Sequence, residues 1–184
     1  MNVVEERIRY FEGGGEKYTD EAMAIAKEYA DEHGIRSIVV ASTTGRTAKK
    51  AAEVFKGNNL VVVTHVHGFR EPDKTEFPDD LRKSLEAEGV KVVTAAHAFI
   101  GVGKLVEGSV GSIIAETLRM FCQGMKVAVE IAAEATDAGY VSTKEDIISI
   151  AGTGRGADTV LVIRPANSSR LFETDVKKVL AMPI

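Results

Sequence analysis

The sequence predicts an α/β fold of three layers, α/β/α, around a mostly parallel sheet of five strands. Short aliphatic runs alternate with helical patterns along most of the chain, as in folds whose parallel strands are joined by helices. These runs lack the polar alternation of a half-solvated strand, so helices should cover both faces of the sheet. Only seven residues, GTGRGAD, join the last two runs. That is too short for a parallel crossover, so the last strand is predicted to be antiparallel. The five runs are 35–41, 60–64, 90–94, 147–151 and 159–164.

Residues at expected boundaries support the helical segments between these runs. Thr19 is a suitable cap for the first helix, and Gly34 is suited to end it in the left-handed conformation. The longest pattern is expected to break near Gly124. Ser142 and Glu145 have the spacing of a capping box, although the segment that they would start is brief. The predicted helices cover 19–33, 46–56, 78–88 and 109–138.

Length and composition predict one cytoplasmic domain over residues 1–184. A chain of 184 residues with 45% hydrophobic and 27% charged residues can bury one core. The net charge of −4 argues against a protein that coats nucleic acid. The single cysteine, Cys122, fits a reducing compartment and is expected to be an inert buried thiol. The start of the chain is too charged for a signal peptide, and no apolar run approaches the ~18 residues of a membrane span.

Polar and glycine-rich segments are expected to meet at one edge of the sheet. Ligands of open α/β sheets bind beyond the carboxyl ends of the parallel strands. Three of the four histidines and both Gly-Arg pairs follow predicted strands, so they should share that edge. The sequence therefore predicts a binding site there. The four segments are STTGRT (42–47), THVHGF (64–69), AHAFIGVG (96–103) and GTGRGADT (152–159).

The turn STTGRT predicts an anion site. A strand-to-helix turn presents free backbone N–H groups at a helix N-terminus, where the helix dipole also favours an anion. Gly45 permits a close backbone approach, and Arg46 can bind phosphate oxygens with two hydrogen bonds. A capped helix without a ligand is the alternative, since Ser and Thr are common caps. The turn lacks the Lys-Ser/Thr of a Walker loop. Further donors are the hydroxyls of Ser42, Thr43, Thr44 and Thr47.

The segment GTGRGADT predicts a second, facing loop. Its alternating glycines permit positive φ angles and a concave row of backbone amides. A glycine-rich hairpin would also explain the pattern. The topology could place this loop beside STTGRT, and two adjacent Gly-Arg turns suit one phosphorylated ligand. The residues concerned are Gly152, Thr153, Gly154, Arg155 and Gly156.

The histidines leave a metal site as a weaker alternative. His65 and His67 alternate along an extended segment, so both rings would point the same way. A catalytic zinc takes about three protein ligands, and His97 is the one obvious third ligand. Because the chain is short for a (β/α)₈ barrel, histidines that contact a ligand or pack within a loop are favoured, and no metal is predicted.

Two stretches resemble the C-terminal domain of pyruvate kinase. IVVASTTGRTAKKAAEVFKGNNLVVVT is similar to its strand, Ser/Thr-Gly-Arg turn, helix and second strand, and IISIAGTGRGADTVLVIRP is similar to its final strands. The resemblance spans most of 19–165. With MFCQGMKVAVEIAAEATDAG, the chain looks closer still to stand-alone archaeal and bacterial proteins of the pyruvate kinase C-terminal-domain-like family.

This resemblance implies a bound ligand but no pyruvate kinase activity. In pyruvate kinase the Ser/Thr-Gly-Arg turn grips a phosphate of an allosteric sugar bisphosphate, which implies a phosphate cradle at 42–47 and a facing loop at 152–156. The stand-alone family implies flavin mononucleotide (FMN) as the cofactor. The catalytic barrel of pyruvate kinase is absent from this sequence. The ring of FMN would then be lined by Thr64, His65, His67, Gly68 and Phe99.

Three functions remain open on the sequence alone. The favoured one is a protein that binds FMN, with flavin-dependent redox activity left undecided. The second is a non-catalytic sensor of a phosphorylated metabolite, and the third is a metal-dependent hydrolase that uses His65, His67 and His97. A homo-oligomer is plausible by analogy with pyruvate kinase.

Overall fold

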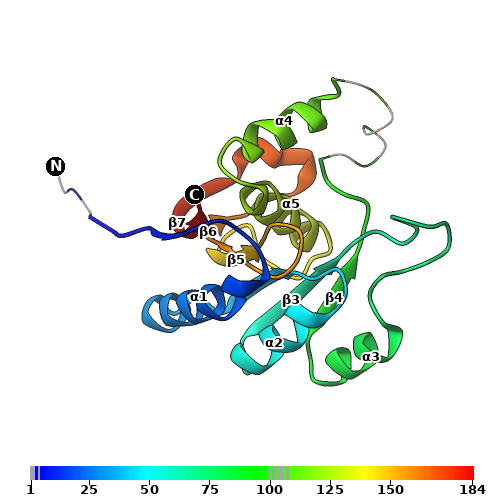
Figure 1. Cartoon of the computed structure of the whole chain (residues 1–184), viewed down its shortest axis with the longest axis horizontal. Coiled ribbons are helices and arrows are strands. Elements are labelled where there is room, and N and C mark those ends of the chain that lie inside the picture. Colours follow the sequence, from blue (N-terminus) through cyan, green and yellow to red (C-terminus); the bar gives the residue numbers. More distant parts are fainter. Residues whose placement is uncertain (1–2, 4, 100, 102, 104–105, 107) are drawn as a thin grey trace.

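One seven-stranded sheet runs through the part of the chain that the structure describes (Figure 1). The structure is a computed structural model and describes residues 3, 5–99, 101, 103, 106 and 108–184. The strand order is β1-β7-β6-β5-β2-β3-β4. The strands are β1 (Arg9–Phe11), β2 (Ser37–Ala41), β3 (Asn59–Thr64), β4 (Lys91–Thr94), β5 (Ile147–Ala151), β6 (Thr159–Arg164) and β7 (Asp175–Pro183).

Helices cover both faces of this sheet, so the predicted three layers are confirmed. Ile38 and Val40 of β2 pack with α1, α2 and α3, whereas Val39 between them packs with α5 on the other face. Helix α4 packs against α5 (Figure 1). No described helix combines the length and the apolar character needed to cross a membrane. The helices are α1 (Thr19–His33), α2 (Arg46–Val54), α3 (Asp79–Ala87), α4 (Val110–Arg119) and α5 (Gln123–Asp137), with short 3₁₀ segments at Glu16–Tyr18 and Ser168–Glu173.

The strand directions agree with the prediction, but the predicted number of strands is wrong. Strands β2, β3, β4 and β5 are parallel, and β6 is antiparallel to β5, as expected from the short connection between them. The sequence pattern predicts five strands and does not indicate β1 or β7. Strand β1 has three residues, of which only Phe11 is buried. In β7 the first three residues are exposed, and Lys177 and the half-buried Lys178 follow each other, so the aliphatic signal of a buried strand is weak there.

Helix boundaries agree with the predictions in part. Gly34 ends α1 with a φ of 67°, as expected. Helix α1 begins at Thr19, but Thr19 does not cap it, because its hydroxyl accepts a hydrogen bond from the Ala157 N–H instead. No helix starts at Ser142, whose hydroxyl accepts from the Lys144 N–H in a turn. The break in the long helical pattern lies at residues 120–122, slightly before the predicted position.

The connections place a change of direction between β2 and β5. The chain moves from β2 through β3 to β4 on one side, and β5 then pairs with the opposite edge of β2. The loops that leave β2 and β5 therefore lie next to each other at the carboxyl edge of the sheet. Such a point in an open α/β sheet opens a crevice for a ligand.

Candidate functional site

A cavity of about 490 Å³ opens at this edge of the sheet, beyond the carboxyl ends of β2, β3 and β5. Its walls include residues from each of the four predicted segments, because parallel strands end together. From AHAFIGVG only His97 lines the cavity among the described residues, and Ile100 and Val102 lie outside them.

Most of the predicted site residues line this cavity. Those that do are Ser42, Thr43, Thr44, Arg46, Thr47, Thr64, His65, Gly152, Gly154, Arg155 and Gly156. Those that the structure places outside the lining are Gly45, His67, Gly68, Phe99 and Thr153.

Two of the residues outside the lining, Gly45 and Phe99, shape the segments that form the cavity wall. Gly45 precedes α2 with a φ of 86°, and a Cβ there would lie 2.1 Å from Leu81 Cδ2. Glycine is therefore required for the turn itself. Phe99 is buried in the core beneath the site, and its backbone N–H donates to Glu130 Oε1 at 3.1 Å. His67, by contrast, is exposed.

The N-terminus of α2 has free donors at the cavity. Its N-cap, Gly45, makes no side-chain cap. Ser42 Oγ accepts from the Ala48 N–H at 3.1 Å, but no described group accepts from the N–H of Arg46 or Thr47. The hydroxyls of the turn are thus only partly explained by helix capping, and two backbone donors remain for an anion.

Asp158 holds the glycine-rich loop in place. This fully buried carboxylate accepts from the N–H of Gly15 at 2.7 Å, the N–H of Thr153 at 2.9 Å and the hydroxyl of Thr159 at 2.8 Å. It therefore ties the N-terminal Gly-Gly-Gly turn to the loop that faces α2. Because three donors converge on it, the loop is fixed before any ligand arrives.

Asp158→Ala is expected to lower the free energy of unfolding by about 2–3 kcal/mol, since it leaves two part-buried backbone donors without an acceptor. Chemical denaturation measures the loss, with Asp175→Ala on the exposed start of β7 as the control. An equal midpoint for the wild type and Asp158→Ala would contradict the role of this carboxylate.

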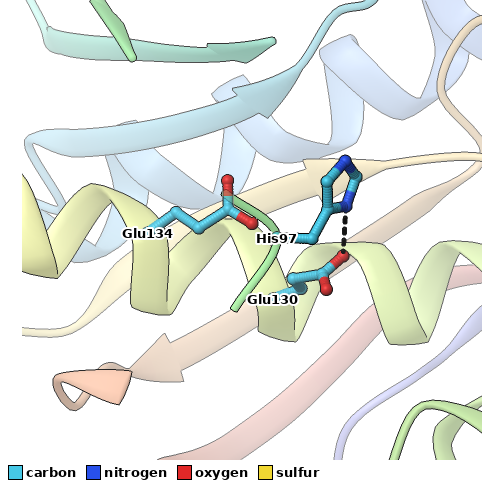
Figure 2. Close-up of side chains that lie close together, drawn as sticks. All are labelled: His97, Glu130 and Glu134. Atoms are coloured by element: carbon cyan, nitrogen blue, oxygen red, sulfur yellow. Dashed lines mark hydrogen bonds and ion pairs between the residues drawn. The ribbon is translucent and has the colours of Figure 1, made fainter. Parts of the chain in front are cut away.

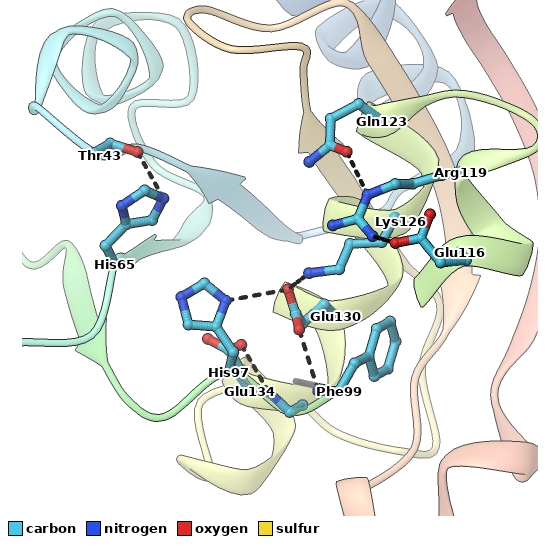
Figure 3. A network of polar contacts seen from close by, with 11 residues as sticks. Thr43, His65, His97, Phe99, Glu116, Arg119, Gln123, Lys126, Glu130 and Glu134 are labelled. Carbon is cyan, nitrogen blue, oxygen red and sulfur yellow. Dashed lines mark hydrogen bonds and ion pairs between the residues drawn. The ribbon is translucent and has the colours of Figure 1, made fainter. Parts of the chain in front are cut away.

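Three aromatic rings stand together at the cavity. The His65 ring centroid lies 4.2 Å from that of Phe69 and 5.7 Å from that of His97, and Phe69 and His97 are stacked at 5.4 Å. His65 Nδ1 lies 2.8 Å from Glu76 Oε2, and its Nε2 lies 3.3 Å from Thr43 Oγ1. A carboxylate accepts, so Nδ1 donates to Glu76, and Nε2 faces the Thr43 hydroxyl. These bonds fix the orientation of the ring, and Figure 3 shows the one with Thr43.

Buried charged side chains of α5 form the wall opposite α2. Lys126, Glu130 and Glu134 are spaced four residues apart, so they share one face of the helix, and they are only 2%, 2% and 5% exposed. Lys126 Nζ donates to Glu130 Oε2, and His97 Nδ1 lies 3.4 Å from the same oxygen (Figure 3). Glu134 Oε1 accepts from the Ala98 N–H at 3.2 Å. The two glutamates thereby hold the segment that follows β4.

The two glutamates titrate in opposite directions. Burial raises the pKa of Glu130, but the hydrogen bond with His97 and the charge of Lys126 outweigh it, so its pKa is lowered overall. For Glu134, burial and then the charge of Glu130 raise the pKa to about 8. At neutral pH Glu130 is therefore a carboxylate and Glu134 is mostly a carboxylic acid.

The same cluster has the only metal-like spacing among the described residues. One ligand atom from each of His97, Glu130 and Glu134 lies within 4.8 Å of the others (Figure 2). His65 and His67 belong to no such group among those residues, so the predicted three-histidine arrangement is not formed. Lys126 already places a cation on Glu130, and its charge opposes a metal ion there.

The charged residues of α5 were missed by the sequence analysis. A helix was predicted over this stretch, within 109–138, but none of its charged residues was assigned to the site. The available signal was the four-residue spacing of three charges on an otherwise apolar helix, which places them on one face. The lining also contains six basic residues, Arg46, Lys50, Arg70, Arg119, Lys126 and Arg155, against four acidic ones, Glu16, Glu76, Glu130 and Glu134.

Comparison with known families assigns most of the chain to one family. A family model described as "Pyruvate kinase, alpha/beta domain" matches residues 20–163. The chain belongs to this family. The matched region of the pyruvate kinase alpha/beta domain includes the loops 42–47 and 152–156, whereas the two unpredicted strands, β1 and β7, lie outside it.

A solved structure of a pyruvate kinase from Cryptosporidium parvum is also similar. It is 14% identical, with a TM-score of 0.39, and the match covers 77% of this chain and 22% of that pyruvate kinase. The chain thus spans about a fifth of the length of the pyruvate kinase that it matches.

Proposed function

We propose that the cavity binds a phosphorylated ligand, and that this ligand is FMN. The observation that carries the proposal is the N-terminus of α2, where the N–H groups of Arg46 and Thr47 have no acceptor among the described residues beside a cavity. Backbone donors and a helix dipole together favour a phosphate.

Side chains around this helix end add to the support for phosphate. Arg46 lines the cavity and makes only an exposed ion pair with Glu16, so its guanidinium can turn to a ligand at small expense. Arg155 on the facing loop is exposed and has no ion-pair partner among the described residues. Two guanidinium groups and two backbone amides would hold one phosphate from both sides.

The other walls suit a flat ring. His65, Phe69 and His97 group their rings at the cavity, whose volume lies within the roughly 300–1,000 Å³ common for small-molecule sites. FMN combines a phosphate with a flat ring system, and the family resemblance implies the same cofactor. When bound, a flavin supplies redox chemistry, and the chain would bind and orient it.

Ligand titration tests this proposal against the sensor of a sugar bisphosphate. FMN fluorescence is expected to be quenched when the protein binds it, and FMN should raise the melting temperature of the protein. Riboflavin lacks the phosphate and is expected to bind more weakly. Stabilisation by a sugar bisphosphate and not by FMN would favour the sensor. A protein that binds neither FMN nor a sugar bisphosphate would refute the phosphate site. Stoichiometric zinc or iron in the purified protein would favour the third function, a metal-dependent hydrolase.

A further inference from the structure

We propose that Glu134 and His97 recognise an amide or imide edge on the ring of the ligand, with Glu134 as a carboxylic acid that donates to the carbonyl oxygen and His97 as the acceptor for the neighbouring N–H. This inference rests on the proposed function, because it concerns the part of the same ligand that lies away from its phosphate. The ligand class is a phosphorylated heteroaromatic compound with a lactam or imide group.

The geometry of Glu134 leaves one of its oxygens for a ligand. Oε1 accepts from the Ala98 N–H at 3.2 Å, and no described residue forms a hydrogen bond with Oε2. The side chain is 5% exposed and lines the cavity, so a ligand in the cavity is the partner within reach. Oε2 is not among the fully buried atoms that lack a partner, so it is accessible from the cavity and can bond a ligand group directly.

His97 provides the complementary acceptor. Its Nδ1 lies 3.4 Å from Glu130 Oε2, which can only accept when ionised, so Nδ1 carries the hydrogen. In the neutral ring Nε2 is then an acceptor. Nε2 is buried, and it is the one buried side-chain nitrogen or oxygen without a hydrogen-bond partner among the described residues. A ligand N–H would remove that deficit.

The charges around Glu134 favour its acid form at neutral pH. On α5 the groups that face it are Glu130, Lys126 and Asp137, and the segment after β4 contributes His97. Burial and the charge of Glu130 raise the pKa of Glu134 to about 8. Lys126 forms its ion pair with Glu130, and no cation of the described residues pairs with Glu134.

The test is the pH dependence of FMN affinity in the wild type and in Glu134→Gln. Only the acid form donates, so wild-type affinity should be about half its pH 7 value at pH 8 and should fall about tenfold by pH 9. Glutamine keeps an acceptor for Ala98 and a donor for the ligand without titrating, so its profile should be flat. Glu145→Gln, at an exposed position, should follow the wild type.

Riboflavin and ribose 5-phosphate separate the two ends of the ligand. Riboflavin keeps the ring edge, so it should show the same loss above pH 8, whereas ribose 5-phosphate should bind independently of Glu134. His97→Phe keeps an aromatic ring but no acceptor, and it should weaken FMN and riboflavin equally. Melting temperatures within a few degrees of the wild type confirm that both variants fold.

Each result decides the inference. Parallel pH profiles for the wild type and Glu134→Gln, in protein that binds FMN, would overturn the role of Glu134 and leave the phosphate site standing. Failure of the wild type to bind FMN or riboflavin at any pH would overturn both proposals. Stoichiometric binding of a divalent metal with release of a proton, lost in Glu134→Gln, would assign the cluster to a metal instead.

Discussion

Lys126→Met should reduce the free energy of unfolding by about 3–5 kcal/mol, the range for removing one partner of a buried ion pair. Lys126 and Glu130 are each 2% exposed and bonded to each other, and the ammonium also lies 5.7 Å from the centre of the Phe99 ring. Methionine keeps most of the packing but leaves the Glu130 charge without its main cation. Denaturation at pH 7 measures the loss, and Lys144→Met at an exposed position is the control.

The pH dependence and a double variant test the cause. The pKa of Glu130 is lowered in the folded protein, so its contribution is present above its unfolded pKa and disappears as the pH falls through the folded value. The difference between the wild type and Lys126→Met should therefore shrink in acid. Lys126→Met combined with Glu130→Gln should recover most of the loss at pH 7. A single variant within about 1 kcal/mol of the wild type would show that His97 alone suffices for Glu130.

The central strands could be predicted because burial on both faces leaves aliphatic runs with few alternatives. Ile38, Val39 and Val40 are fully buried against both helical layers, and this environment tolerates little else. Strands β1 and β7 were not predicted because they lie at one side of the sheet and are partly solvated. Their sequences therefore contain lysine and arginine among the apolar residues. Local pattern alone does not separate such strands from loops.

The loops of the site could be predicted for a topological reason. Parallel strands bring their carboxyl ends to one edge, so Thr43, His65, His97 and Arg155 could be placed together without coordinates. The pairing of particular side chains across the cavity could not be predicted from the sequence. Glu76 reaches His65 from within the loop that follows β3, and that contact depends on the path of the loop.

The buried charges of α5 show a different limit. On a helix, Lys126 and Glu130 four residues apart are common on a solvated face. Their burial depends on packing against the sheet and on the segment after β4, whose N–H groups at Ala98 and Phe99 bond the glutamates. Sequence spacing gives the shared face, and only tertiary contacts decide whether that face meets water or a cavity.

Arg46→Ala combined with Thr44→Ala is expected to weaken FMN binding about 100-fold, because a charged and a neutral hydrogen bond to phosphate are lost together. The fold should survive, since the Arg46 ion pair with Glu16 is exposed and contributes little. Ser42 still accepts from the Ala48 N–H at the start of α2. Isothermal titration at fixed ionic strength measures the affinity, and melting temperature reports on the fold.

Riboflavin and a distant arginine make this result specific to phosphate. The affinity for riboflavin should change little in the double variant, because riboflavin has no phosphate for Arg46 and Thr44 to contact. Arg36→Ala, at an exposed position just before β2, removes the same net charge away from the cavity. It should leave the affinity for FMN unchanged, which would show that the loss in the double variant is not an effect of net charge. An equal loss for FMN and riboflavin would mean that the turn shapes the ring pocket. Unchanged binding of both would return the STTGRT turn to the role of a helix start, with the free N–H groups of Arg46 and Thr47 bonded to water.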